Sequence, residues 1–323
     1  MHNELETISM VSKLIEKEEV RAINNTIMDN KKYLQPAIVA QLASIELKAR
    51  LVVEGFISGL HRSPFRGFSV EFAEHRAYRP GDDIRFMDWK ILGRTDRYYV
   101  KQFEEETNLR SMIVVDTSAS MGYASKGNIS KFEYASYLAG ALSYLMMKQQ
   151  DAVGLALYDT EVRSFLPPRS KPSYIQEILR SLGNAVPANT TGTGKALDRL
   201  AERISRRGLV VILSDFFDDI DSIITALKHF RHKNHEVVVM QILDPRERDF
   251  KFGVDANFKD LESGEEILTQ PYQIQKTYSK AMNDFIDTLK RECFQRGIDY
   301  VLMDTAEPFD KALRGYLAKR TRM

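Results

Sequence analysis

The chain has 323 residues, 43% of them hydrophobic, and its 46 basic and 45 acidic side chains give a formal net charge of +1. This balance lacks the basic excess of nucleic-acid-binding proteins, so no nucleic acid partner is expected. One cysteine excludes an internal disulfide and a thiolate metal cluster. The first 20 residues show no signal-peptide pattern, and no stretch approaches the roughly 18 apolar residues that span a bilayer. We therefore expect a cytoplasmic protein without a transmembrane segment.

Three segments differ in composition. Residues 1–60 are rich in Leu, Ile, Glu and Lys, and the apolar spacing over 41–59 predicts an amphipathic helix. Residues 61–109 are dense in Arg, aromatic and acidic side chains, which indicates short strands and loops that pack on a core. Residues 110–323 alternate between strand and helix patterns. We expect an N-terminal helical region, an extension and a main domain with these boundaries.

The main domain is predicted to be an α/β fold. Strands are predicted at 112–116, 153–158, 161–166, 209–215, 236–243 and 300–304, the second and third pairing across a turn. Helices are predicted at 132–147, 174–182, 195–205, 220–230, 273–296 and 311–318, with a hairpin over 258–268. Continuous apolar strands separated by helices indicate a doubly wound, mostly parallel sheet with helices on both faces.

Oxygen-bearing side chains follow two of these strands. Asp116 ends one strand and precedes Ser118 and Ser120, Asp215 ends another, and Thr191 lies in a Thr- and Gly-rich loop before a helix. Sites in parallel sheets form at the carboxyl ends of strands. Two acids and three hydroxyls suit Mg²⁺ better than zinc or copper. We predict a metal site from these five residues, with Mg²⁺, Mn²⁺ and Ca²⁺ left open and one position free for water or a partner's carboxylate.

A structural interpretation of the same residues stays open. Ser118 and Ser120 could cap a helix, and the Thr-Gly pairs could form a turn with an N-cap.

The order Asp116-x-Ser118-x-Ser120, then Thr191, then strand-ending Asp215 resembles the metal-ion-dependent adhesion site of von Willebrand factor A domains. The resemblance covers about residues 109–305. It implies that the three hydroxyls coordinate the ion directly or through water, and that the two aspartates act through water or balance its charge.

One residue departs from the pattern of that family. Phe216 follows Asp215 where many members carry glycine, which leaves the shape of this loop open.

The segment over residues 71–90 interleaves charges of both signs with aromatic residues. Because Arg pairs with carboxylates and stacks on rings, this segment can form an ion-paired structural plug or a docking surface for a partner. The candidate docking residues are Arg76, Tyr78, Arg79, Asp82, Asp83, Arg85, Asp88 and Trp89.

Together with the adhesion-site motif, the pattern Arg-x-Tyr-x-Pro-Gly-Asp-Asp-x-Arg-x-x-Asp-Trp at 76–89 is similar to a bacterial family known as domain of unknown function 58. This resemblance covers about residues 40–320. Members commonly accompany MoxR-type AAA+ ATPases, which implies an adaptor or co-chaperone that binds such an ATPase or its client proteins. Many relatives carry transmembrane helices, whereas this sequence shows none.

Three interpretations follow from these patterns, of which the third is a purely structural subunit. The leading hypothesis is a non-catalytic, Mg²⁺-dependent protein-interaction module that is monomeric alone. The alternative is a metal-dependent phosphohydrolase or phosphotransferase with Asp116 as nucleophile. Enzymes of the haloacid dehalogenase type need a second acid two residues after the nucleophile, where this chain has Ser118, and no supporting lysine is evident.

Two other motifs do not indicate a functional site. Thr193-Gly194-Lys195 ends like a phosphate-binding loop, but Asn189 and Ala196 break that pattern. His229, His232 and His235 are spaced by three, and we interpret them as a solvated helix end.

Overall fold

The computed structural model describes residues 36–40, 44–60, 75–78, 87, 93–94, 98–101, 109–252, 256–259, 266–269, 271–309 and 313. Two compact units divide the chain: Met1–Arg62 with Leu109–Met323, and Ser63–Asn108. The boundaries drawn from composition at residues 60 and 109 remain a prediction. The predicted helix at 311–318 lies outside the described residues, apart from Leu313.

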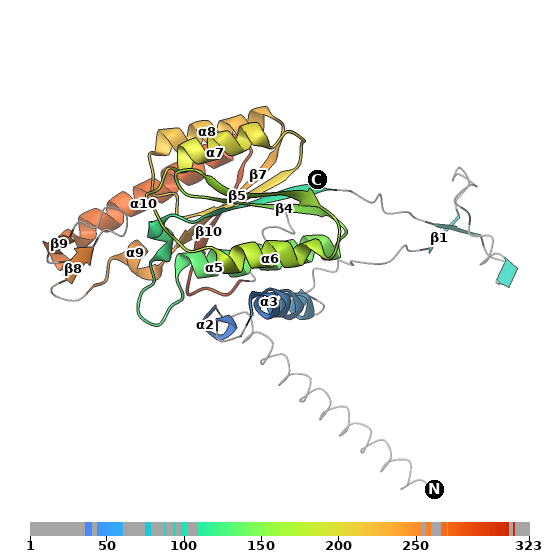
Figure 1. Ribbon diagram of the computed structural model, residues 1–323, viewed down its shortest axis with the longest axis horizontal. Helices are drawn as coiled ribbons and strands as arrows, with labels where there is room; N and C mark the ends of the chain where they lie inside the picture. The colour runs from blue at the N-terminus through green and yellow to red at the C-terminus, as the bar shows by residue number, and fades with distance from the viewer. Residues whose placement is uncertain are drawn as a thin grey trace, which may run out of the picture. The chain divides into compact units, whose positions relative to one another are not determined.

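The first unit is built around a six-stranded sheet (Figure 1). Its strands, from one edge to the other, are β10 (Asp299–Asp304), β7 (Glu236–Leu243), β6 (Leu209–Ser214), β3 (Arg110–Asp116), β4 (Ala152–Tyr158) and β5 (Val162–Arg169). All neighbours pair in parallel except β5, which runs antiparallel to β4. The central strands are buried along almost their whole length, as expected of a sheet covered on both faces. The predicted α/β fold class is confirmed.

The strand order places a topological switch at the centre of the sheet. From β3 the chain moves outward through β4 to β5, and from β6 it moves the other way through β7 to β10. The crossover connections therefore diverge between β3 and β6, which are direct neighbours. In open α/β sheets, this divergence leaves a crevice at the carboxyl ends of the two strands, where ligands bind.

Helices cover both faces of the sheet (Figure 1). One face carries α7 (Thr193–Arg203), α8 (Ile220–His232) and α10 (Pro271–Gln295), and the other carries α5 (Lys131–Lys148) and α6 (Tyr174–Asn184). On the first face, one cluster of buried residues joins strands and helices through Val114, Ile212, Leu197, Leu227 and Leu289. Each of these helices was predicted, with ends that differ by at most two residues.

A third layer comes from the N-terminal part of the chain. Helix α3 (Ile45–Leu60) lies against α5 and confirms the helix predicted over 41–59, of which residues 41–43 are not described. The two helices approach closely because Gly140 has no side chain: a Cβ there would lie 3.2 Å from Cβ of Ala49. The ammonium of Lys48 donates a hydrogen bond to the Tyr137 hydroxyl at 2.7 Å. A short helix, α2 (Pro36–Val39), precedes α3.

The second unit contains an antiparallel pair, β1 (His75–Ala77) and β2 (Tyr99–Lys101). Of the candidate docking residues, Arg76 lies in β1, and the ring of Tyr78 lies 6.3 Å from that of Tyr98 between centroids. The docking residues Arg79, Asp82, Asp83, Arg85, Asp88 and Trp89 lie outside the described residues. Their role as a docking surface stays a prediction.

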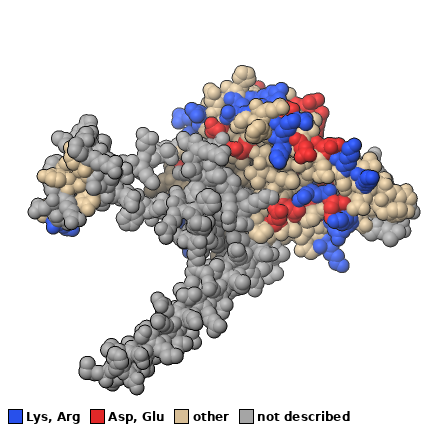
Figure 2. Space-filling view, turned by 180° about the vertical axis from the view of Figure 1, so that it is seen from behind, with Lys and Arg blue, Asp and Glu red and all other residues tan. Residues whose placement is uncertain are grey.

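The first unit also contains several smaller elements. The predicted hairpin is present as β8 (Ala256–Lys259) paired with β9 (Glu266–Thr269). A short helix, α9 (Pro245–Asp249), and a 3-10 turn, η2 (Ala119–Gly122), were not predicted. Among the described residues, no helix has both the length and the apolar character needed to cross a bilayer. Basic and acidic side chains are interspersed over the described part of the face shown in Figure 2.

Candidate metal centre

All five parallel strands end in an aspartate. Asp116 and Asp304 are the last residues of β3 and β10, and Asp159, Asp215 and Asp244 directly follow β4, β6 and β7. Two of them, Asp116 and Asp215, were predicted as site residues from the sequence. The strand pattern held the signal for the rest, because every predicted strand except 161–166 was followed or ended by an acid. This edge of the sheet is therefore rich in carboxylates.

Asp116 is held in place on both carboxylate oxygens. Its Oδ1 accepts a hydrogen bond from the backbone N–H of Ser118 at 2.8 Å. Its Oδ2 accepts hydrogen bonds from the hydroxyls of Ser214 at 2.6 Å and Tyr158 at 3.4 Å. The side chain is fully buried, and burial, together with the nearby Asp215, raises its pKa to about 7. Asp116 is thus oriented by its neighbours before any ligand arrives.

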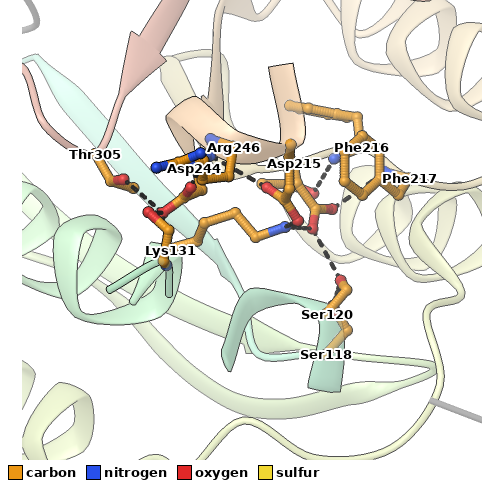
Figure 3. Close-up of polar contacts among 12 residues, drawn as sticks. Ser118, Ser120, Lys131, Asp215, Phe216, Phe217, Asp244, Arg246 and Thr305 are labelled. Carbon is orange, nitrogen blue, oxygen red and sulfur yellow. Dashed lines mark hydrogen bonds and ion pairs between the residues drawn. The ribbon is translucent and has the colours of Figure 1, made fainter. Parts of the chain in front are cut away.

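The two serine hydroxyls connect this loop to Asp215 (Figure 3). The oxygens of Ser118 and Ser120 lie 3.1 Å apart, and Ser120 donates a hydrogen bond to Oδ2 of Asp215 at 2.9 Å. Ser118 precedes η2 in the N-cap position, yet its side chain makes no capping hydrogen bond. Capping therefore does not account for this hydroxyl.

The loop that carries Thr191 is bonded to the same edge. The backbone N–H of Ala119 donates to the carbonyl of Asn189 at 2.9 Å, and that of Ala188 donates to the carbonyl of Thr117 at 2.9 Å. Thr191 lies two residues after Asn189 and is half-buried. The N-cap residue of α7 is Gly192, one position after Thr191.

Asp215 stands in a loop of unusual backbone conformation. Phe216 has φ of +60°, in the left-handed region that favours glycine and that costs a bulky residue on the order of 1–3 kcal/mol. Its ring is fully buried in the core, which offsets this cost. The backbone N–H of Phe217 donates to Oδ1 of Asp215 at 3.1 Å. The loop therefore adopts the conformation that glycine would favour, although this chain has phenylalanine there.

Lys131 is a functional candidate that the sequence analysis missed (Figure 3). Its ammonium lies 2.7 Å from Oδ2 of Asp215 and 2.6 Å from Oε1 of Glu247, and its side chain is fully buried. Burial by itself lowers the pKa of Lys131, but the two carboxylates outweigh this effect and hold the pKa above its ordinary value. Lys131 is the first residue of α5, where the helix dipole disfavours a cation. A lysine directly after the helix cap Ser130 was the signal available in the sequence.

Glu247 and Asp244 belong to the short helix α9. Asp244 caps this helix by accepting from the N–H of Arg246 at 2.8 Å, and it also accepts from the backbone N–H and the hydroxyl of Ser125 at 3.0 and 2.9 Å. Glu247 accepts from the N–H of Asp244 and completes a capping box. Burial raises the pKa of Glu247 to about 6 against the opposing effect of Lys131. The pattern Asp244-Pro245-x-Glu247 could have predicted this helix.

The arrangement fits a divalent cation of the Mg²⁺ type. Neighbouring ligands in an octahedron with metal–oxygen distances of 2.0–2.1 Å lie about 2.9 Å apart. The separations from Ser120 to Ser118 and to Asp215, 3.1 and 2.9 Å, are close to that value. No three His, Cys, Asp or Glu side chains of the described residues group as metal ligands by themselves, so an ion here would depend on the serine hydroxyls.

The local charge also favours a cation. The ammonium of Lys131 bonds Asp215 and Glu247, and Asp116 lies near Asp215, so these three carboxylates, when ionised, would exceed the charge of the ammonium by two. A divalent ion would balance that excess.

A cavity of about 770 Å³ opens beside η2. It is bounded by α3, α5 and α6, and its lining includes Lys48, Ala119, Glu133, Tyr137 and Pro187. Ala119 lies between the two site serines, so the cavity adjoins the loop that carries them.

Comparisons with known proteins place the chain in a family. The family model described as "Protein of unknown function DUF58" matches residues 74–285. "Uncharacterized protein Rv1480" of Mycobacterium tuberculosis (strain ATCC 25618 / H37Rv) is 30% identical over 232 residues, which are 71% of this chain and 72% of the relative. "Uncharacterized protein Mb1516" of Mycobacterium bovis gives the same values.

Solved structures of low sequence identity also match. BatB from Bacteroides thetaiotaomicron is 17% identical with a TM-score of 0.45, and the match covers 67% of this chain and 100% of that chain. The von Willebrand factor A domain of SpRpn10 is 14% identical with a TM-score of 0.36, over 64% of this chain and 94% of that chain. By the family match over residues 74–285 and the relatives at 30% identity, the chain is a member of the DUF58 family, and the domain is a doubly wound α/β fold.

Proposed function

We propose that this protein is a non-catalytic interaction module that binds Mg²⁺ at the carboxyl edge of its sheet and docks a partner protein through the ion. The ligands are the hydroxyls of Ser118, Ser120 and Thr191, with Asp116 and Asp215 acting through water or as counter-charges. An acidic side chain of the partner completes the coordination of the ion.

The observation that carries this proposal is the geometry around Ser120. Its hydroxyl lies within hydrogen-bonding distance of both Ser118 and Asp215, at separations typical of adjacent ligands on one small ion. These residues lie in the loops that follow β3 and β6, the two neighbouring strands at the topological switch of the sheet. An ion held partly by neutral hydroxyls keeps much of its charge and attracts a carboxylate.

The partner we propose is a MoxR-type AAA+ ATPase or one of its clients, on the basis of the family resemblance. The cavity beside η2 supports a protein partner, because it offers room next to the ion for the residues that flank an incoming acid. In this role the chain acts as an adaptor or co-chaperone.

Metal binding is tested first, by titrating the full chain with Mn²⁺ and following the free ion by electron paramagnetic resonance. We expect one site in the wild type and none in Ser120→Ala. Ser173→Ala is the matched control, because Ser173 is a helix N-cap residue whose side chain makes no capping bond. Equal Mn²⁺ binding by Ser120→Ala and the wild type would show that other residues bind the ion.

Partner docking is tested by capture of a purified MoxR-type ATPase of the same organism in Mg²⁺ and in EDTA. Capture should require Mg²⁺ and should be lost in Ser120→Ala but kept in Ser173→Ala. Capture that ignores both EDTA and Ser120→Ala would contradict docking through the ion.

One observation favours the alternative function, which is phosphoryl transfer with Asp116 as nucleophile. Lys131, which no sequence pattern had placed there, lies at the same edge of the sheet and could neutralise a phosphate. Asp116, however, is fully buried and both of its oxygens already accept hydrogen bonds, so neither is presented to a substrate. Ser118 also occupies the position of the required second acid.

An assay with a generic aryl phosphate separates the two functions. We expect no turnover above the buffer rate. Turnover that Asp116→Asn abolishes would establish the enzymatic alternative.

A further inference from the structure

Two groups with different roles converge on one oxygen of Asp215. Oδ2 accepts the hydroxyl of Ser120 at 2.9 Å and the ammonium of Lys131 at 2.7 Å (Figure 3). Ser120 belongs to the loop that would hold the ion, whereas Lys131 comes from α5 and brings a positive charge of its own. The same carboxylate is therefore shared between a proposed metal ligand and a tethered cation.

We infer that Lys131 is a built-in competitor of the metal ion: its ammonium neutralises Asp215 in the ion-free protein and weakens the binding of a divalent cation. The inference rests on the proposed metal site and concerns how that site is regulated. The helix dipole disfavours a cation at the start of α5, so the two carboxylates hold the lysine there against this effect.

The physical reason is repulsion between like charges in a buried place. Lys131 is fully buried, so its charge is poorly screened by water, and an ion near Ser120 would lie close to the ammonium across Oδ2 of Asp215. The ion must therefore bind against this charge or displace it from Asp215. In either case the affinity for the ion is lower than the oxygen donors alone would give.

Glu247 supplies the second position for the displaced ammonium. Its Oε1 lies 2.6 Å from Nζ of Lys131, and the capping box of α9 fixes the carboxylate. When the bond to Asp215 is lost, Lys131 keeps this partner and is not left as an isolated buried charge. Glu247 is thus a positioning residue that lets the lysine release Asp215.

The experiment measures the affinity of the full chain for Mn²⁺ by electron paramagnetic resonance in four proteins. Lys131→Met removes the charge and keeps an unbranched side chain one atom shorter, so it should tighten Mn²⁺ binding on the order of tenfold. Lys131→Arg keeps the charge and should show no such gain. Glu247→Gln should weaken binding on the order of tenfold, because Lys131 then stays on Asp215.

Two additions separate this role from a general change in charge or folding. In the Lys131→Met background, Glu247→Gln should have a smaller effect than in the wild type, since it acts through the lysine. Lys233→Met is the matched control, because the Lys233 ammonium bonds the carbonyls of Ala201 and Glu202 rather than the site. In EDTA, Lys131→Met should have a lower melting temperature than the wild type. Addition of Mg²⁺ should raise the melting temperature of Lys131→Met by more than it raises that of the wild type.

The outcomes distinguish this inference from the proposed function. Tighter binding by Lys131→Met supports the competition, even if the wild type binds no Mn²⁺ and the metal-dependent function fails. Equal affinity of the wild type and Lys131→Met overturns the competition and leaves the metal site standing. Absence of Mn²⁺ binding in every variant overturns both.

Discussion

The hydroxyl of Ser214 lies 2.6 Å from Oδ2 of Asp116, so the last residue of β6 fixes the carboxylate that ends its neighbour β3. The same hydroxyl accepts the backbone N–H of Phe216 at 2.8 Å and so also supports the loop that carries Asp215. Ser214 therefore connects the two aspartates of the proposed site without being a candidate ligand itself.

We predict that Ser214→Ala lowers the free energy of unfolding by about 1–3 kcal/mol, because it removes a hydrogen bond to a buried carboxylate. It should also raise the pKa of Asp116 further, since the bond from Ser214 opposes the effect of burial. Urea unfolding at pH 8 measures the first effect.

Ser111→Ala is the matched control: this buried serine of β3 has a hydroxyl without a hydrogen-bond partner among the described residues, so its removal should be neutral or stabilising. Equal losses in both variants would contradict the role given to Ser214.

The N-terminal cap of α5 should contribute both to the free energy of unfolding and to Mn²⁺ affinity. Ser130 accepts the N–H of Glu133 at 3.1 Å, and Glu133 bonds back to the N–H of Ser130 at 3.0 Å. Ser130→Ala should cost about 1 kcal/mol by loss of the cap. Because Lys131 is the next residue, the same change should also alter Mn²⁺ affinity. Ser173→Ala in α6, whose serine makes no side-chain capping bond, should cost under about 0.5 kcal/mol in the same urea titration.

Close packing of α7 against α8 leaves no room for a side chain at residue 194. A Cβ on Gly194 would lie 1.8 Å from Oγ and 2.7 Å from Cβ of Ser222. Gly194→Ala should therefore destabilise the fold by about 1–3 kcal/mol. Ser222→Gly should rescue part of this loss in the double variant, although glycine in a helix costs up to about 1 kcal/mol.

The contrasting glycine is Gly183 in α6. A Cβ there would meet Cγ2 of Ile45 at 3.8 Å, which is ordinary contact. Gly183→Ala should leave stability unchanged or raise it by up to about 1 kcal/mol. Thermal melts of the variants check both predictions, and a failure of Ser222→Gly to improve Gly194→Ala would show that the clash lies elsewhere.

His235 should make stability depend on pH. This residue was expected at a solvated helix end, but it is buried, with Nε2 3.2 Å from the carbonyl oxygen of Ile204. Burial lowers the pKa of His235 below its ordinary value. Below about pH 6.5 the unfolded chain therefore binds more protons than the folded chain, and the free energy of unfolding falls as pH drops.

We predict that His235→Gln loses less stability between pH 7.5 and pH 5.5 than the wild type does, as measured by urea unfolding at each pH. Parallel pH profiles for the two proteins would show that His235 is not the group responsible.

The pattern of apolar residues was enough to predict the sheet and the helices of the main unit. Strands such as Leu209–Ser214 are short apolar runs that end at a polar residue, and this local signal does not depend on the rest of the chain. The order of Asp116, Ser118, Ser120 and Asp215 predicted that they would gather at one edge, and the structure links them through hydrogen bonds. Metal binding at that edge stays a prediction.

Lys131 and Glu247 could not be predicted in the same way. Their pairing depends on the start of α5 meeting the short helix α9, whose residues are more than 100 positions away in the sequence. A helix of five residues has too few positions to show a period, so α9 was missed. The conformation of Phe216 was equally hidden, because tertiary packing of its ring overrides the local preference for glycine.

The close contact of α3 with α5 makes the unit at residues 63–108 an insertion, because the chain leaves the first unit after Arg62 and re-enters it at Leu109. Folding must therefore bring Ala49 against Gly140 across the whole inserted segment. The entropy of closing such a loop grows only with the logarithm of its length, about 0.6 kcal/mol for each doubling. The inserted unit can consequently lengthen or shorten at little entropic cost to the sheet whose edge carries the aspartates.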